Sequence, residues 1–260
     1  MPKVNRGGKR STGTSAFSFR ARAGSATPQQ AQDIIDTLSN EDSVSYDQYM
    51  TLSDDEKADA IATLMNQGVP DFLDPSMTQK LLYYTELDGK PLMASDSAVS
   101  QMNGSSLYRT VHDYYNQRAD VNYTAKEIYD QLTKGDQTAV SGQGGSAYGK
   151  GIYFAESYTE SRNYRSTRNN NLTLRAKLNN NARVVSYSQA SNAVRSEINK
   201  GTKLGRMYSR MNSDDRTSVW ALNNGYNVVR DNYSGYNVVL DRRAMTVSTK
   251  TVNPAKQTRW

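Results

Sequence analysis

Apolar residues recur at helical spacing over the first third of the chain, from Thr27 to about Leu87, and this pattern predicts three helices. The first begins after Thr27, whose hydroxyl can cap it. The second follows Ser53, where Glu56 three residues later completes a capping box. The third is expected to start at Asp74 and to end before a turn that contains Gly and Pro. We therefore expect a small helical layer ahead of the main domain.

After Pro91 the pattern changes to short apolar runs separated by Gly and Asn, which predicts strands. Two helix-like stretches lie among them, at 124–135 and at 188–201, where Gly201 can stop the helix. The fold class expected is α+β. The predicted strands are 106–111, 151–155, 172–178, 182–187, 226–230, 236–241 and 244–248.

The sequence divides into four parts by pattern and charge. These are a basic arm at 1–24, a helical lead-in at 25–90, the main domain at 91–250 and a tail at 251–260. The arm holds six basic residues and no acid, so the rest of the chain carries 26 basic and 26 acidic groups. A segment with so little to bury is expected to be disordered. It is either a contact for nucleic acid or capsid, or a solubilising tail.

Composition excludes several kinds of site. The chain has no cysteine and a single histidine, His112, which we interpret as a polar loop residue. Disulfides, zinc-thiolate sites and multi-histidine metal clusters are therefore excluded, and no metal is predicted. No segment resembles a signal peptide or reaches the ~20 apolar residues of a membrane helix. We expect a soluble protein of a reducing compartment, with no membrane partner.

The most informative stretch is 141–164, where five glycines precede the apolar-aromatic strand residues 152–155. Dense glycine allows a backbone to approach a ligand closely, and the ring of Tyr153 could stack on a planar group. The glycines precede the strand and no GK[ST] follows, so neither a Walker loop nor a Rossmann fingerprint is present. On residue types alone this stretch predicts a hairpin loop.

The string YGKGIYFAESYTESRNY, residues 148–164, resembles the NAD-cleft motif of poly(ADP-ribose) polymerases and related ADP-ribosyltransferases. The resemblance implies that Tyr153 stacks on nicotinamide and that Gly149, Gly151 and Phe154 line the NAD cleft.

Upstream, the string SLYRTVHD resembles the first core strand of the toxin-like branch. That resemblance gives Tyr108 and Arg109 a role in binding NAD. An arginine suits this role because its planar guanidinium can hold phosphate or ribose oxygens while staying charged. The alternative is an arginine on a strand edge that pairs with a surface carboxylate.

The family's third element is a glutamate at the start of a late strand, which stabilises an oxocarbenium-like transition state. Residues 225–247 resemble this part, but Ser234 or Gly235 stands where the glutamate is expected. Its role would fall to Asp231, Glu156 or Glu160. Removing one oriented group of this kind costs about 2.7–4 kcal/mol, so the departure bears directly on activity.

The combined resemblance, over roughly 105–248, is to phage-encoded, toxin-like mono-ADP-ribosyltransferases with a split β-sheet. It implies that NAD is a substrate, that host proteins are modified, and that the protein acts in the host cytoplasm or travels in the virion. Residues 204–218 are expected to form a surface loop that selects the target. The alternative function is a catalytically degenerate virion or nucleic-acid-binding protein. A third interpretation is a glycine-rich β protein unrelated to NAD.

Overall fold

A computed structural model describes residues 22–69, 75–87, 89–116, 121–134, 148–164 and 170–252. It is a mixed structure in which ten helices accompany one large sheet and one hairpin within these ranges, so the predicted α+β class is confirmed. Most of the predicted basic arm, the glycines at 142–145 and the tail from 253 onward lie outside the described residues.

The helical layer comprises α1 (Pro28–Ser39), α2 (Tyr46–Thr51), α3 (Asp54–Asn66) and α4 (Met77–Tyr84). Reciprocal capping boxes start α1 and α3 at Thr27 and Ser53, as the sequence predicts. The third predicted helix is capped by Ser76 instead of Asp74. The sequence does not predict α2, because its six residues are too few to show a helical period.

Eight strands form one mixed sheet in the order β1-β10-β6-β2-β5-β9-β8-β7. The two outermost pairs, β1 with β10 and β7 with β8, are parallel, and the other pairs are antiparallel. All seven predicted strands are present, each to within two residues. The strands are β1 (Leu92–Ala94), β2 (Leu107–His112), β5 (Ile152–Ala155), β6 (Asn171–Leu178), β7 (Val184–Ser186), β8 (Val228–Asp231), β9 (Tyr236–Val239) and β10 (Met245–Ser248); a separate hairpin joins β3 (Tyr114–Asn116) to β4 (Val121–Tyr123).

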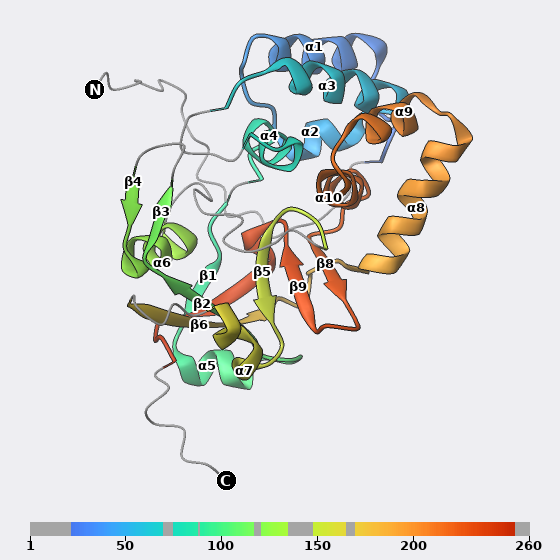
Figure 1. Cartoon of the computed structure of the whole chain (residues 1–260). Helices are drawn as coiled ribbons and strands as arrows, with labels where there is room; N and C mark the ends of the chain where they lie inside the picture. Colours follow the sequence, from blue (N-terminus) through green and yellow to red (C-terminus); the bar gives the residue numbers. More distant parts are fainter. Residues whose placement is uncertain are drawn as a thin grey trace.

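The sheet is nearly divided between β2 and β5. These strands share one register pair, Tyr108 with Ala155, whereas β2 and β6 pair at six successive positions. Figure 1 shows β2 and β6 running across the molecule while β5, β9 and β8 run along it. One half of the sheet therefore consists of β1, β10, β6 and β2, and the other of β5, β9, β8 and β7.

The remaining helices connect and cover the strands. The predicted helices at 124–135 and 188–201 are confirmed as α6 (Ala125–Thr133) and α8 (Tyr187–Lys200), and Gly201 ends α8 with a left-handed φ of 64°. The others are α5 (Asp96–Gln101), α7 (Tyr158–Ser161), α9 (Lys203–Arg210) and α10 (Ser213–Asn223).

The predicted surface loop at 204–218 is wrong, because these residues belong to α9 and α10. Leu204, Met207, Tyr208 and Met211 are buried and recur at helical spacing. The Arg, Ser and Asp residues between them hid this period. The segment is therefore part of the core packing and not a free loop.

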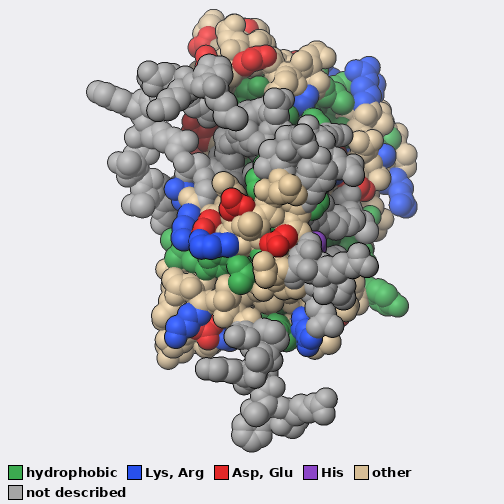
Figure 2. Space-filling view, turned by 60° about the vertical axis from the view of Figure 1, so that its left-hand side comes forward, with side chains coloured by type: hydrophobic (Ala, Val, Ile, Leu, Met, Phe, Trp, Pro, Cys, Tyr) green, Lys and Arg blue, Asp and Glu red, His purple; other side chains and the backbone are tan. Residues whose placement is uncertain are grey.

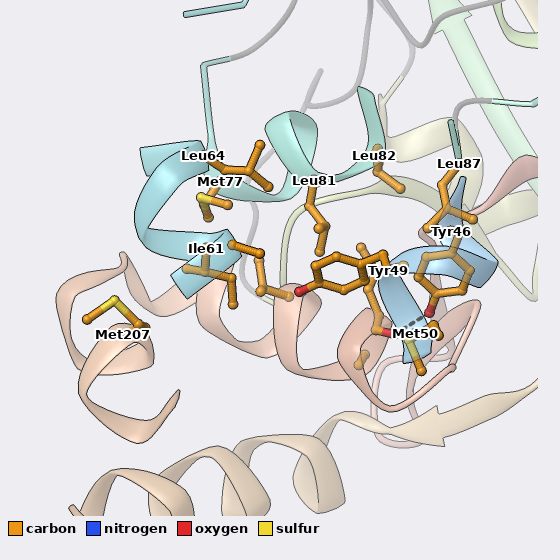
Figure 3. Close-up of a cluster of buried hydrophobic side chains, with 14 of the residues drawn as sticks. Tyr46, Tyr49, Met50, Ile61, Leu64, Met77, Leu81, Leu82, Leu87 and Met207 are labelled. Carbon is orange, nitrogen blue, oxygen red and sulfur yellow. Dashed lines mark hydrogen bonds between the residues drawn. The ribbon is translucent and has the colours of Figure 1, made fainter. Parts of the chain in front are cut away.

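The larger hydrophobic core lies between the helical layer, α8 to α10 and one face of β7, β8 and β9. Figure 3 shows Tyr49 and Ile61 pointing inward between α2, α3 and the α9–α10 region. The hydroxyl of Tyr46 donates to the carbonyl of Leu222, and that of Tyr49 donates to Oδ1 of Asn223 at 2.7 Å. The helical layer thus binds the last turn of α10 directly.

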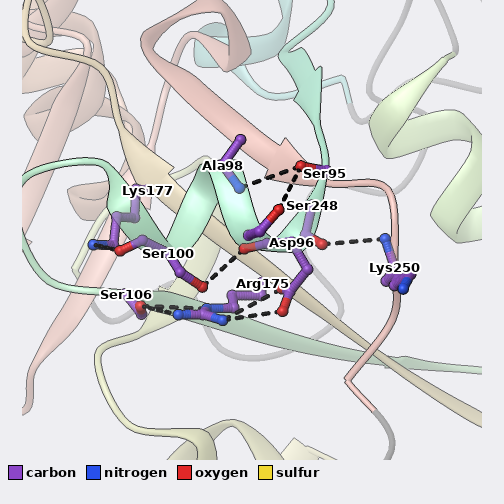
Figure 4. Close-up of polar contacts among 10 residues, drawn as sticks. Ser95, Asp96, Ala98, Ser100, Ser106, Arg175, Lys177, Ser248 and Lys250 are labelled. Atoms are coloured by element: carbon purple, nitrogen blue, oxygen red, sulfur yellow. Dashed lines mark hydrogen bonds and ion pairs between the residues drawn. The ribbon is translucent and has the colours of Figure 1, made fainter.

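A smaller core packs α6 against the other face of the sheet. Buried Arg242 donates from Nη1 to the carbonyls of Gln131 at 2.7 Å and Leu132 at 3.2 Å, which satisfies the end of α6. Figure 4 shows α5 held on β6, where Arg175 pairs with Asp96 at 3.3 Å. No helix in the described ranges is long and apolar enough to span a membrane.

Candidate functional site

Arg109 lies inside the molecule, where the two halves of the sheet separate. Its side chain is only 6 % exposed. It sits on β2 opposite Leu174 of β6, and its Nη1 donates to the main-chain carbonyl of Tyr153 on β5 at 2.9 Å. The guanidinium therefore bridges the division, instead of lying at a sheet edge as the alternative interpretation supposed.

A row of residues crosses the division on one face of the sheet. Tyr108 is in register with Ala155, Ala155 with Tyr236, and Tyr236 with Asp231. Residues in register share a face, and Tyr153 shares it too because strand side chains alternate. The structure thus brings together three of the predicted site residues, Tyr108, Tyr153 and Asp231. It adds Tyr236, which the sequence did not single out.

Four half-buried tyrosines cluster on this face: Tyr148, Tyr153, Tyr187 and Tyr236. The ring of Tyr148 stacks on Tyr236 at 6.3 Å and meets Tyr187 edge-on at 5.4 Å, while Tyr153 lies 6.4 Å from Tyr236. The Tyr153 hydroxyl donates to the carbonyl of Gly149 at 2.7 Å and accepts from the Tyr148 amide at 3.0 Å. The ring of Tyr153 is therefore held in place by the glycine-rich segment.

Asp231 closes the row at the end of β8. Partial burial acts to raise its pKa, but hydrogen bonds from Ser234 and Tyr148 outweigh burial and lower the pKa below its ordinary value. The Ser234 amide donates to its carboxylate at 2.7 Å. Asp231 is thus an ionised group held in a tight turn next to the tyrosine cluster.

The side chains of Arg109, Phe154 and Glu156 lie on the opposite face, because each of these residues directly follows a member of the row in the sequence. Phe154 is 1 % exposed and belongs to the smaller core, so its side chain is closed to a ligand. Glu156 forms an ion pair with Arg230 and accepts from Nδ2 of Asn237 at 3.2 Å. The sequence could not show this separation, because it depends on the register of β5 with β9.

Gly149 and Gly151 are explained by packing of the protein on itself. Gly149 has a φ of 111°, and a Cβ added there would lie 2.6 Å from Oγ of Ser218. A Cβ on Gly151 would lie 2.7 Å from Cγ1 of Val238. The close approach that these glycines permit is thus to α10 and β9.

Glu160 reaches the place where the resemblance expects a glutamate. Gly235 precedes β9 with a φ of 71°, and a Cβ added there would lie 3.7 Å from Oε2 of Glu160. Glu160 comes from α7, the helix that follows the GIYFA strand. Sequence spacing names it as a candidate but cannot show that α7 folds back over the turn before β9.

His112 is the last residue of β2 and pairs with Asn171, so its interpretation as a loop residue is wrong. Within the described ranges, no three acidic or histidine side chains are arranged to hold a metal ion.

Comparisons with family models, with curated proteins and with solved structures gave no match. The site is therefore defined by the geometry of this chain and by the resemblance of its motifs.

Proposed function

We propose that this chain is an NAD-dependent mono-ADP-ribosyltransferase, similar to those encoded by phages and directed at host proteins. The hydrogen bond from Arg109 to the Tyr153 carbonyl carries the proposal. Two motifs 44 residues apart in sequence, each resembling part of an NAD cleft, meet there at the division of the sheet. The half-buried tyrosines, which offer rings to a planar base, lie on the face of the sheet opposite the Arg109 side chain.

The proposed reaction breaks the bond between nicotinamide N1 and ribose C1″. Nicotinamide leaves with the electron pair, the acceptor side chain bonds to C1″, and the acceptor's proton passes to a carboxylate or to water. Arg109 supplies fixed positive charge near the phosphates or ribose from one face of the sheet, and Tyr153 supplies a stacking surface on the other, so NAD would have to cross the division between the two halves. A carboxylate close to C1″ stabilises the positive charge that develops on the ribose.

A second candidate is a protein that keeps this fold without turnover, as a virion component or a nucleic-acid-binding protein. Two observations favour it. No glutamate starts β9, and Asp231 and Glu156 are both engaged with protein groups. A carboxylate that is already bonded to protein groups is less able to stabilise the positive charge that develops on a substrate.

The test uses labelled NAD and a bacterial lysate, with transfer to protein and release of nicotinamide measured together. Tyr153→Ala is expected to weaken NAD binding and abolish both signals. Tyr226→Ala is the matched control, because Tyr226 is also half-buried and stacks on Trp220 away from the row. NAD binding without turnover by the unaltered chain would favour the second candidate, and no NAD binding would reject the transferase.

A further inference from the structure

The exposed surface of α8 and α9 is strongly basic. Residues 187–210 contain five basic residues and one acid, Glu197. By contrast, residues 25–90, which include the neighbouring helical layer, carry 13 acidic and 3 basic residues. Figure 2 shows carboxylate side chains gathered at the top of the face it presents, at the level of α1 and α3. Charge is therefore not spread evenly along the sequence.

The lysines of this surface are neutralised and the arginines are not. Lys200 pairs with Glu197 at 2.8 Å, and Lys203 pairs with Asp59 of α3 at 2.6 Å. Within the described ranges, no carboxylate pairs with the three exposed arginines, which are Arg195, Arg206 and Arg210.

Arg206 and Arg210 are exposed on the same side of α9, and Nη1 of Arg206 also donates to the carbonyl of Gly201 at 2.5 Å. They are four residues apart in one helix, so their side chains lie one above the other. The apolar residues of α9 face the other way, and Leu204, Met207 and Tyr208 are buried. The distance along α9 from Arg206 to Arg210 is about 6 Å at 1.5 Å per residue, enough to face two successive phosphates of one strand.

The rest of this surface is polar and uncharged. Exposed amides and hydroxyls surround the arginines, and the large exposed apolar residues of the described chain all lie elsewhere. A protein partner would be expected to find aromatic or aliphatic anchors at the centre of its interface. A single-stranded nucleic acid would need exposed aromatic rings on which to stack its bases. Neither feature is present between residues 187 and 210. The exposed arginines, amides and hydroxyls that this surface does present are groups that bind a phosphate backbone.

We propose that the outer face of α8 and α9 binds the phosphates of double-stranded nucleic acid, with Arg206 and Arg210 as its principal contacts. Arginine suits this role because its guanidinium can donate two parallel hydrogen bonds to one phosphate. Binding of this kind is independent of base sequence and weakens steeply with salt. The proposal does not depend on transferase activity.

The experiment titrates the full chain with a labelled DNA duplex of about 20 base pairs at several salt concentrations. The double variant Arg206→Gln, Arg210→Gln is compared with Lys126→Gln, Lys134→Gln, in which Lys126 lies on α6 and Lys134 follows its last residue. The control removes the same charge from two lysines that are 73 % and 67 % exposed and pair with Asp130. Thermal melting checks that both variants fold.

The arginine variant is expected to lower the slope of log affinity against log salt by about 1.8, since each lost phosphate contact removes about 0.9. The control should show the same slope of log affinity against log salt as the unaltered chain. Any contribution to that slope from basic residues elsewhere is then common to both. Equal losses in both variants, or no duplex binding by the unaltered chain, would overturn the proposal. Competition by polyglutamate as strong as that by DNA would point instead to an acidic protein partner.

Discussion

Arg109 on β2 donates its Nη1 hydrogen bond to the carbonyl of Tyr153 on β5, at the point where regular pairing between the two strands stops. The side chain takes over the bridging role that main-chain bonds play elsewhere in the sheet. The same residue that the sequence selects for ligand binding therefore also holds the two halves of the sheet together.

Replacing Arg109 should consequently cost stability as well as ligand affinity. Arg109→Lys removes a charge-assisted hydrogen bond from a buried position, and we expect the free energy of unfolding to fall by about 1.5–3 kcal/mol. Urea denaturation measures this. Arg175→Lys on the adjacent strand is the control. Its pair with Asp96 is partly exposed, so a loss below about 1 kcal/mol is expected. Equal losses in the free energy of unfolding for the two variants would show that Arg109 contributes no more to the sheet than Arg175 does.

Gly151 should tolerate no side chain. Gly151→Ala would place a methyl group 2.7 Å from Val238 and 3.0 Å from the carbonyl of Val239, which forces β5 away from β9. The expected cost is about 1–3 kcal/mol in the free energy of unfolding. Gly68→Ala meets no atom within 4 Å and should stay within about 1 kcal/mol of the unaltered chain. If Gly151→Ala also left the free energy of unfolding unchanged, packing against β9 would not explain the glycine, and a role in contacting a ligand would be favoured.

Asn223 should link the helical layer to the rest of the fold. Its side chain accepts from Tyr49 and donates to the Tyr208 hydroxyl at 2.9 Å, and its carbonyl accepts from buried Lys57 at 3.2 Å. Asn223→Ala leaves both tyrosine hydroxyls without this partner and should cost about 2–3 kcal/mol. Asn224→Ala, at the neighbouring exposed position, should cost less than about 1 kcal/mol. This role implies that the helical layer and the rest of the fold unfold in one cooperative transition. A variant whose helical layer unfolds in a separate transition would contradict it.

Alkaline pH should unfold the protein through its buried tyrosines. Burial raises the pKa of Tyr46, Tyr49 and Tyr208 well above 10, the ordinary value. Above about pH 10 the unfolded chain loses these protons while the folded chain keeps them, so the free energy of unfolding falls as pH rises. Burial lowers the pKa of Lys57, which acts in the opposite direction up to about pH 10.4. Tyr208→Phe should reduce the loss measured between about pH 10 and 12, whereas exposed Tyr233→Phe should not.

Local patterns were sufficient to predict most elements of this fold but not their mutual placement. Capping residues and alternation locate α1, α3 and the seven strands, because these signals lie within a few neighbouring residues. The face that a strand residue occupies depends on register with a partner far along the chain, so the opposite orientations of Tyr153 and Phe154 acquire meaning only in the sheet. For the same reason Tyr236 could not be foreseen as a neighbour of Tyr148.

If the chain transfers ADP-ribose, the three candidate carboxylates should differ in their effect on turnover. Asp231 is held by Ser234, and Glu156 by Arg230 and Asn237. Within the described ranges, Glu160 makes no ion pair, and its Oε2 lies over Gly235.

We expect Glu160→Gln to reduce nicotinamide release by about 10²–10³-fold at unchanged NAD affinity, the loss typical of one oriented electrostatic group. Glu156→Gln and Asp231→Asn should cost less, and Glu197→Gln, on the outer face of α8, should have no effect. Loss of turnover only with Asp231→Asn would place the reacting ribose on the tyrosine face of the sheet. Turnover unaffected by all three substitutions would mean that none of these carboxylates stabilises the transition state.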